Sequence, residues 1–77
     1  MVLDMEGNYS KIVLTPKETE VLTWVMLGKT DGEIAVILGI TKNTVDTHIR
    51  NIYKKYNVYN RVTAVVAGLR LGSLALY

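Results

Sequence analysis

Five polar side chains recur at helical spacing in the middle of the chain. They are Asn43, Asp46, Thr47, Arg50 and Lys54. Their spacings of 3, 1, 3 and 4 residues place them on one side of an α-helix. Amide, carboxylate, hydroxyl and guanidinium groups can hydrogen-bond base edges in the major groove, and lysine binds phosphate. The chemistry that this pattern predicts is recognition of double-stranded DNA.

The other side of the same stretch is apolar, and the stretch is basic. Its apolar residues are Val45, Ile49, Ile52, Tyr53 and Tyr56. Residues 41–61 hold five basic residues against Asp46 alone, a net charge of +4, whereas residues 1–40 have a net charge of −3 and the whole chain +2. A basic segment in a nearly neutral domain is typical of an element that faces phosphate. On charge alone, the alternative is a solvated helix face that happens to be basic.

The composition argues against several other classes of protein. The chain has 77 residues, which is enough for one domain, and 49% of them are apolar, as in globular proteins. With no cysteine and one histidine, we expect neither a disulfide framework nor a zinc site, and no cofactor. No paired-carboxylate site, Ser/His/Asp arrangement or glycine-rich phosphate loop is evident, so an enzyme is not expected. No apolar run reaches the ~20 residues of a membrane span, and the N-terminus is acidic, so a cytoplasmic protein is expected.

Capping signals divide the chain into four predicted helices. The helices are expected to begin after Thr15, Thr30, Thr41 and Asn60, and to end at Gly28, Gly39, Asn57 and Gly72. Glu18 and Glu33 lie three residues after their threonines and complete capping boxes. The expected buried face is Ile34, Ala35, Ile37 and Leu38 in the second helix, and Val62, Val65, Val66 and Leu69 in the fourth. The sequence thus predicts an all-α domain over residues 14–77, preceded by an arm over residues 1–13 that is extended near residues 12–14.

Three residues between 35 and 45 indicate a helix–turn–helix unit. Ala35 is small where two helices must cross closely, Gly39 permits a sharp turn, and Val45 packs the next helix back onto the first. In such units the second helix lies in the major groove and its N-terminal half contacts base edges. The alternative is a helical hairpin with a polar outer face and no ligand.

The same residues carry a resemblance to a known family. The motifs extend from Leu14 to Leu74 and include Leu14-Thr15-Pro16-Lys17-Glu18, Glu33-Ile34-Ala35, Leu38-Gly39-Ile40-Thr41, Thr44-Val45 with His48, and Asn60-Arg61. They resemble the LuxR/GerE-type helix–turn–helix domain of bacterial transcription regulators, in particular its short stand-alone members. The resemblance implies four helices and a homodimer that places the helix over residues 41–56 in the major groove of each half-site. It also implies that the helix beginning at Asn60 forms the dimer contact.

Pattern and resemblance together predict the residues that contact DNA. These are Thr30, Lys42, Asn43, Thr44, Asp46, Thr47, His48, Arg50, Asn51, Lys54, Lys55 and Arg61. At Asp46 the family usually has a basic residue. A carboxylate there can accept a hydrogen bond from cytosine N4, but it repels phosphate.

Small residues in the last helix suggest a dimer interface. Gly68 in a helix interior costs about 1 kcal/mol relative to alanine. A close helix–helix approach would explain the glycine, and the alternative is strain tolerated in a short helix. The predicted dimer residues are Ala64, Ala67, Gly68 and Leu71.

The sequence is therefore compatible with two functions. The first is a sequence-specific transcription regulator that binds double-stranded DNA as a homodimer and recruits or blocks RNA polymerase. The second is an interaction module that heterodimerises through the helix beginning at Asn60 and antagonises a larger DNA-binding regulator. Asp46 and the low net charge favour the second, whereas the ordered motifs favour the first.

Overall fold

The computed structural model of the chain describes residues 2–3, 9–10 and 13–74, and that part contains four helices. They are α1 (Pro16–Met26), α2 (Asp31–Leu38), α3 (Lys42–Tyr56) and α4 (Arg61–Arg70). Two two-residue strands, β1 (Val2–Leu3) and β2 (Tyr9–Ser10), pair antiparallel with Val2 opposite Ser10. The predicted all-α, four-helix fold is confirmed. Ile12 of the expected extended segment lies outside the described residues, and residues 13–15 are neither helix nor strand.

The predicted caps start each helix. Thr15 Oγ1 accepts a hydrogen bond from the Glu18 amide at 3.1 Å, and Glu18 Oε1 accepts one from the Thr15 amide at 2.9 Å. Thr30 and Glu33 form the same capping box, while Thr41 and Asn60 each cap through one side-chain oxygen. Because these bonds span three residues, local sequence is enough to specify them.

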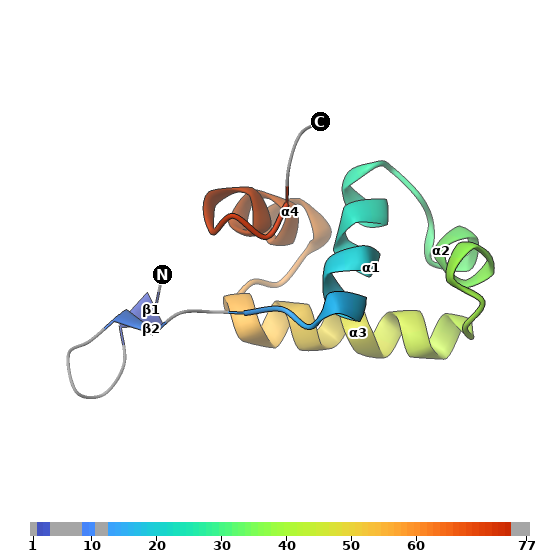
Figure 1. Cartoon of the computed structure of the whole chain (residues 1–77), viewed down its shortest axis with the longest axis horizontal. Helices are drawn as coiled ribbons and strands as arrows, with labels where there is room; N and C mark the ends of the chain where they lie inside the picture. Colours follow the sequence, from blue (N-terminus) through green and yellow to red (C-terminus); the bar gives the residue numbers. More distant parts are fainter. Residues whose placement is uncertain (1, 4–8, 11–12, 75–77) are drawn as a thin grey trace.

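Helix α3 is the support on which the other helices are arranged. It lies along one side of the molecule with α1 across it, α2 near its first half and α4 near its second half (Figure 1). One cluster of buried residues joins α1, α3 and α4 and consists of Leu14, Leu22, Ile52, Tyr56, Ala64 and Leu74. A second cluster joins α1, α2 and α3 and consists of Val21, Ile34, Ala35, Val45 and Ile49. Since α3 contributes to both clusters, its rotation about its own axis is fixed, and so is the face that it presents to solvent.

Two of the expected buried faces are partly wrong. In α4, Ala64 and Gly68 are buried, whereas Val62 and Val66 are 73% and 41% exposed. A Cβ atom on Gly68 would lie 2.9 Å from Leu74 Cδ1 and 3.0 Å from Leu22 Cδ2, so α4 turns its small residues inward to approach α1. In α2, Ile37 is 43% exposed because Ile34 and Ala35 fill the contact with α1 and α3.

Gly39 forms the turn between α2 and α3 in a left-handed conformation, with φ 67° and ψ 33°. A Cβ atom there would meet no other atom within 4 Å, so the cost of a side chain is conformational alone. We expect Gly39→Ala to destabilise the fold by about 1 kcal/mol, which lowers the Tm by about 5 °C.

Gly32→Ala is the matched control for the Gly39 substitution. Gly32 also has open space around its Cβ position, but it lies inside α2 without a positive φ. This variant is expected to raise the Tm by a few degrees, because alanine favours the helix. Thermal unfolding followed by circular dichroism measures both, and a Gly39→Ala variant as stable as Gly32→Ala would contradict the assignment of the turn.

Candidate nucleic-acid interface

The side of α3 that faces away from the core is polar and accessible. Val45, Ile49, Ile52 and Tyr56 are buried on the inner side of the helix. On the outer side, the structure brings together six of the predicted DNA-contacting residues, which are the exposed Lys42, Asn43, Thr47, Arg50 and Lys54 and the half-exposed Asp46. The two faces of α3 are therefore separated as the residue spacing predicts.

Three of these side chains, those of Asp46, Arg50 and Thr47, have partners within α3. Arg50 Nε lies 3.0 Å from Asp46 Oδ2, one helical turn earlier. The Thr47 hydroxyl donates to the Asn43 carbonyl oxygen at 3.0 Å, so its lone pairs and its methyl group remain available to a ligand. The outer face thus offers a partly neutralised arginine, a hydroxyl acceptor and a free amide.

Three further predicted residues flank this face. Thr44 lies in the first turn of α3, where its hydroxyl is 2.8 Å from that of the capping residue Thr41. His48 and Asn51 are partly buried along the helix. These three residues border the exposed face of α3.

Lys55 lies on α3 but is directed to the core. Its Nζ is 2.6 Å from Glu18 Oε1 of α1, and it also donates to the Val13 carbonyl oxygen at 3.4 Å. Glu18 is only 3% exposed. The ammonium group is thus committed to a buried carboxylate, and we leave Lys55 out of the proposed interface.

The pair with Lys55 contributes to the pKa of Glu18, a role that the sequence did not predict. Burial by itself raises the pKa of this carboxyl, but the hydrogen bonds from Lys55 and from the Thr15 amide outweigh burial and lower the pKa below its ordinary value. The sequence nevertheless indicates that Glu18 is buried. Glu18 lies four residues after Leu14 and four before Leu22, which are both buried, so it falls on the apolar face of α1.

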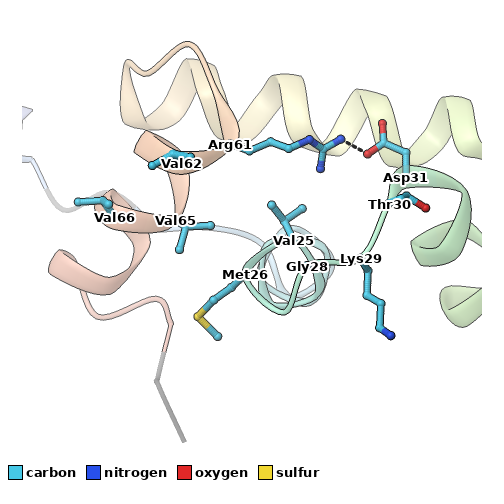
Figure 2. Close-up of a pocket in the computed structure, with 10 residues that line it drawn as sticks. All are labelled: Val25, Met26, Gly28, Lys29, Thr30, Asp31, Arg61, Val62, Val65 and Val66. Atoms are coloured by element: carbon cyan, nitrogen blue, oxygen red, sulfur yellow. Dashed lines mark hydrogen bonds and ion pairs between the residues drawn. The ribbon is translucent and has the colours of Figure 1, made fainter.

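Arg61 and Thr30 also have partners within the chain. Arg61 of α4 forms an ion pair with Asp31 at the start of α2 (Figure 2). The Thr30 hydroxyl accepts a hydrogen bond from the Glu33 amide at 3.2 Å as the cap of α2. Backbone hydrogen bonding from Thr30 also lowers the pKa of Glu33. Arg61 holds α4 to the helix–turn–helix unit, and both residues are left out of the proposed interface.

Exposed apolar side chains of α4 border a groove next to this ion pair. The groove is lined by Val62, Val65 and Val66 of α4 and by Val25 and Met26 of α1 (Figure 2). The residues that the sequence predicts for a dimer interface lie mostly on the inner side of α4. Ala64 is 0% exposed, Gly68 is buried against Leu22 and Leu74, and Ala67 and Leu71 pack on the core. These small residues pack within the chain, and the exposed large apolar side chains of α4 are Val62 and Val66.

The described residues offer little for other chemistry. Among them no group of three or more His, Cys, Asp or Glu side chains could hold a metal ion. None of the four helices combines the length and the apolar content that a membrane-spanning helix requires. The accessible polar face of α3 is the feature that most clearly suggests a ligand.

Comparisons with known proteins identify relatives of this chain. The family model for bacterial regulatory proteins of the LuxR family matches residues 12–67. The transcriptional activator protein AnoR of Acinetobacter nosocomialis is 40% identical over 74 residues, which cover 96% of this chain and 31% of AnoR. The quorum sensing-dependent transcriptional regulator VjbR of Brucella abortus is 46% identical over 67 residues, which cover 87% of this chain and 26% of VjbR.

A solved structure extends the likeness to the fold. The structure of transcription factor GerE matches with a TM-score of 0.79 at 34% identity, and the match covers 83% of this chain and 96% of GerE. The chain spans less than a third of the length of AnoR and VjbR but nearly the whole of GerE. The family match extends over all of α1, α2 and α3 and most of α4. This chain belongs to the LuxR family of bacterial regulatory proteins.

Proposed function

We propose that the chain is a sequence-specific DNA-binding transcription regulator that inserts α3 into the major groove. The observation that carries this proposal is the outer face of α3, where Asn43, Thr47 and Arg50 are accessible while the inner face is anchored in both core clusters. A rigidly held helix with hydrogen-bonding side chains on its free side is what reading of base edges requires. The transcriptional regulators named above support the same function.

The lysines at the two ends of α3 suit phosphate contacts. Lys42 and Lys54 are exposed and twelve residues apart, which is about 18 Å along a helix axis. The major groove is about 12 Å wide. The two ammonium groups therefore flank the residues placed to read bases, and they can reach phosphates on opposite sides of the groove.

A homodimer completes the proposed complex. The chain has a net charge of only +2, so one copy has few phosphate contacts with which to hold DNA. Two copies joined through the exposed Val62 and Val66 of α4 would present two α3 helices to half-sites one helical turn, roughly 34 Å, apart. Regulation would follow from recruiting RNA polymerase to a promoter or blocking its access.

Binding to duplex DNA as a function of salt tests the proposal, with the site first selected from random duplexes. For the wild type, log K should fall against log salt with a slope of about −0.9 per phosphate contacted. Arg50→Ala should weaken binding to the selected site by about 1–3 kcal/mol and relax the sequence preference. Lys54→Ala should weaken all duplexes about equally and reduce the slope by about 1.

Lys17→Ala provides a control for the loss of one positive charge. Lys17 lies on α1 in an exposed pair with Glu20, 3.7 Å away, so this variant should retain both the slope and the preference. A folded wild-type dimer that binds no duplex at low salt would contradict the proposed function. That result would favour the antagonist that heterodimerises through α4, and Asp46→Lys should then create DNA affinity, because it removes the carboxylate that repels phosphate.

A further inference from the structure

Arg50 is held through only one edge of its guanidinium group. Its Nε atom is 3.0 Å from Asp46 Oδ2, and the two side chains are 73% and 48% exposed. Within residues 13–74, neither Nη atom of Arg50 has an ion-pair partner. The carboxylate thus engages one side of the planar group and leaves the two Nη atoms available as a fork.

The two free Nη atoms of Arg50 match the hydrogen-bond acceptors of one base, guanine. Guanine presents two acceptors, N7 and O6, in the major groove, and a guanidinium group can donate to both at once. The planar fork is rigid, so what the side chain must still supply is the orientation of that plane. A carboxylate at Nε restricts the orientation before DNA arrives and reduces the freedom that is lost on binding.

The strength of the interaction between Asp46 and Arg50 depends on whether water surrounds the two side chains. An exposed ion pair in water contributes little. Once α3 lies in a groove from which water is excluded, the same charges interact more strongly. Asp46 also repels phosphate, which weakens binding to sequences where Arg50 finds no guanine.

We propose that Asp46 is a positioning residue that holds Arg50 to read one guanine in each half-site. The inference rests on the proposed function of α3 and adds to it the base that is read and a role for the acid. Asp46 then acts through Arg50 rather than through its own contact with cytosine. Specificity rises in two ways, because the guanine contact is strengthened and binding to other sequences is weakened.

The experiment compares wild type, Asp46→Asn, Arg50→Ala and the double variant on the selected duplex. Each guanine of the half-site is replaced in turn by adenine, with its partner base. The wild type should discriminate at one guanine by about 10- to 100-fold, the range of a good bidentate contact. Arg50→Ala should abolish this discrimination. Asp46→Asn should reduce it about tenfold and at the same time tighten binding to random duplexes, because one negative charge is lost.

The double variant and a matched control distinguish the positioning of Arg50 by Asp46 from the effect of the change in net charge. In the Arg50→Ala background, Asp46→Asn should have no further effect at that guanine, since the two residues act as one unit. Glu20→Gln removes an acid from the exposed intrahelical pair of α1 and makes the same change in net charge. It should leave the discrimination at the guanine unchanged. In the free protein, the NMR signal of the Arg50 Nε–H group should shift in Asp46→Asn and remain in place in Glu20→Gln.

Three results would overturn the inference, and they are distinct from one another. Unchanged guanine discrimination in Asp46→Asn would show that Arg50 needs no positioning. A change at another base pair that persists in the Arg50→Ala background would show that Asp46 reads a base itself. In both cases the wild type still binds a preferred sequence and the proposed function stands. If the folded wild type binds no duplex, the proposed function fails and the inference fails with it.

Discussion

We expect the wild type to be dimeric and a Val62→Asp/Val66→Asp double variant to be monomeric and to bind a duplex with two half-sites at least ~100-fold more weakly. Both valines are exposed on α4, so the acids add charge to the proposed contact without entering the core. Position 62 lies in the first turn of α4, where an acid favours the helix. The variant should therefore stay folded. Sedimentation gives the oligomeric state, and titration of labelled duplexes gives the affinity.

A duplex with a single half-site provides the internal control for this variant. One α3 can engage it in either protein, so wild type and double variant should bind it within a fewfold of each other, whereas the two-half-site duplex separates them. Val36→Asp makes the same change at a valine of α2 that is 83% exposed, and it should leave the dimer intact. A double variant that remains dimeric and binds the full site as tightly as the wild type would contradict the assignment of the dimer surface to α4.

The helix boundaries could be predicted because their causes are local. Thr15, Thr30, Thr41 and Asn60 each bond to an amide three residues ahead, and such bonds depend on nothing distant in the chain. The turn at Gly39 likewise follows from the conformational freedom of glycine. The outer face of α3 was predictable for a related reason, since its polar and apolar residues form two separate stripes.

The face that α4 buries could not be predicted from spacing. Two apolar stripes run along this helix, one through Val62 and Val66 and the other through Ala64 and Gly68, and periodicity favours neither. The larger side chains suggest the core, but the space between α4 and α1 is narrow, and only the small residues fit against Leu22 and Leu74. This choice depends on how closely two helices approach, which is a property of the assembled fold.

The acidic partners of Lys55 and Arg61 could not be predicted either, because these contacts also depend on the assembled fold. Lys55 and Glu18 are 37 residues apart, and Arg61 and Asp31 are 30 apart. A basic cluster in the sequence looks like one surface, although the fold sends Lys54 outward and Lys55 to a buried acid. The net charge of the segment over residues 41–61 therefore overstates the positive charge that is available to DNA.

Removal of the Lys55 charge should destabilise the protein more than a typical substitution of a partly exposed residue does. In Lys55→Met the carboxylate of Glu18, 3% exposed, keeps the Thr15 amide but loses its counter-ion. Breaking a fully buried pair costs about 3–5 kcal/mol. Since the Lys55 side chain is 35% exposed, water screens the pair and we expect a loss of about 2 kcal/mol at neutral pH. Lys54→Met removes the neighbouring exposed charge and should change the stability by less than about 0.5 kcal/mol.

The pH dependence shows whether the loss comes from the charge of Glu18. In the wild type, pairing keeps the pKa of Glu18 below its ordinary value of 4.5. The stabilisation is therefore complete above the unfolded pKa and is lost as the pH falls through the lower folded pKa. Lys55→Met removes the hydrogen bond and the charge of Lys55, so we expect the pKa of Glu18 to be higher than in the wild type, and protonation then relieves the unpaired charge. The difference in unfolding free energy between wild type and variant should be largest near pH 7 and shrink below about pH 4.5.

Urea denaturation of both proteins between pH 3 and 7 measures this difference in unfolding free energy. Glu18→Gln/Lys55→Met removes both charges, keeps an oxygen to accept from the Thr15 amide, and should recover part of the stability lost at neutral pH. A difference between wild type and Lys55→Met that stays constant across this pH range would show that the aliphatic chain of Lys55, rather than its charge, stabilises the contact between α1 and α3. In that case the ammonium group would again be available to phosphate, and Lys55 would return to the proposed DNA interface.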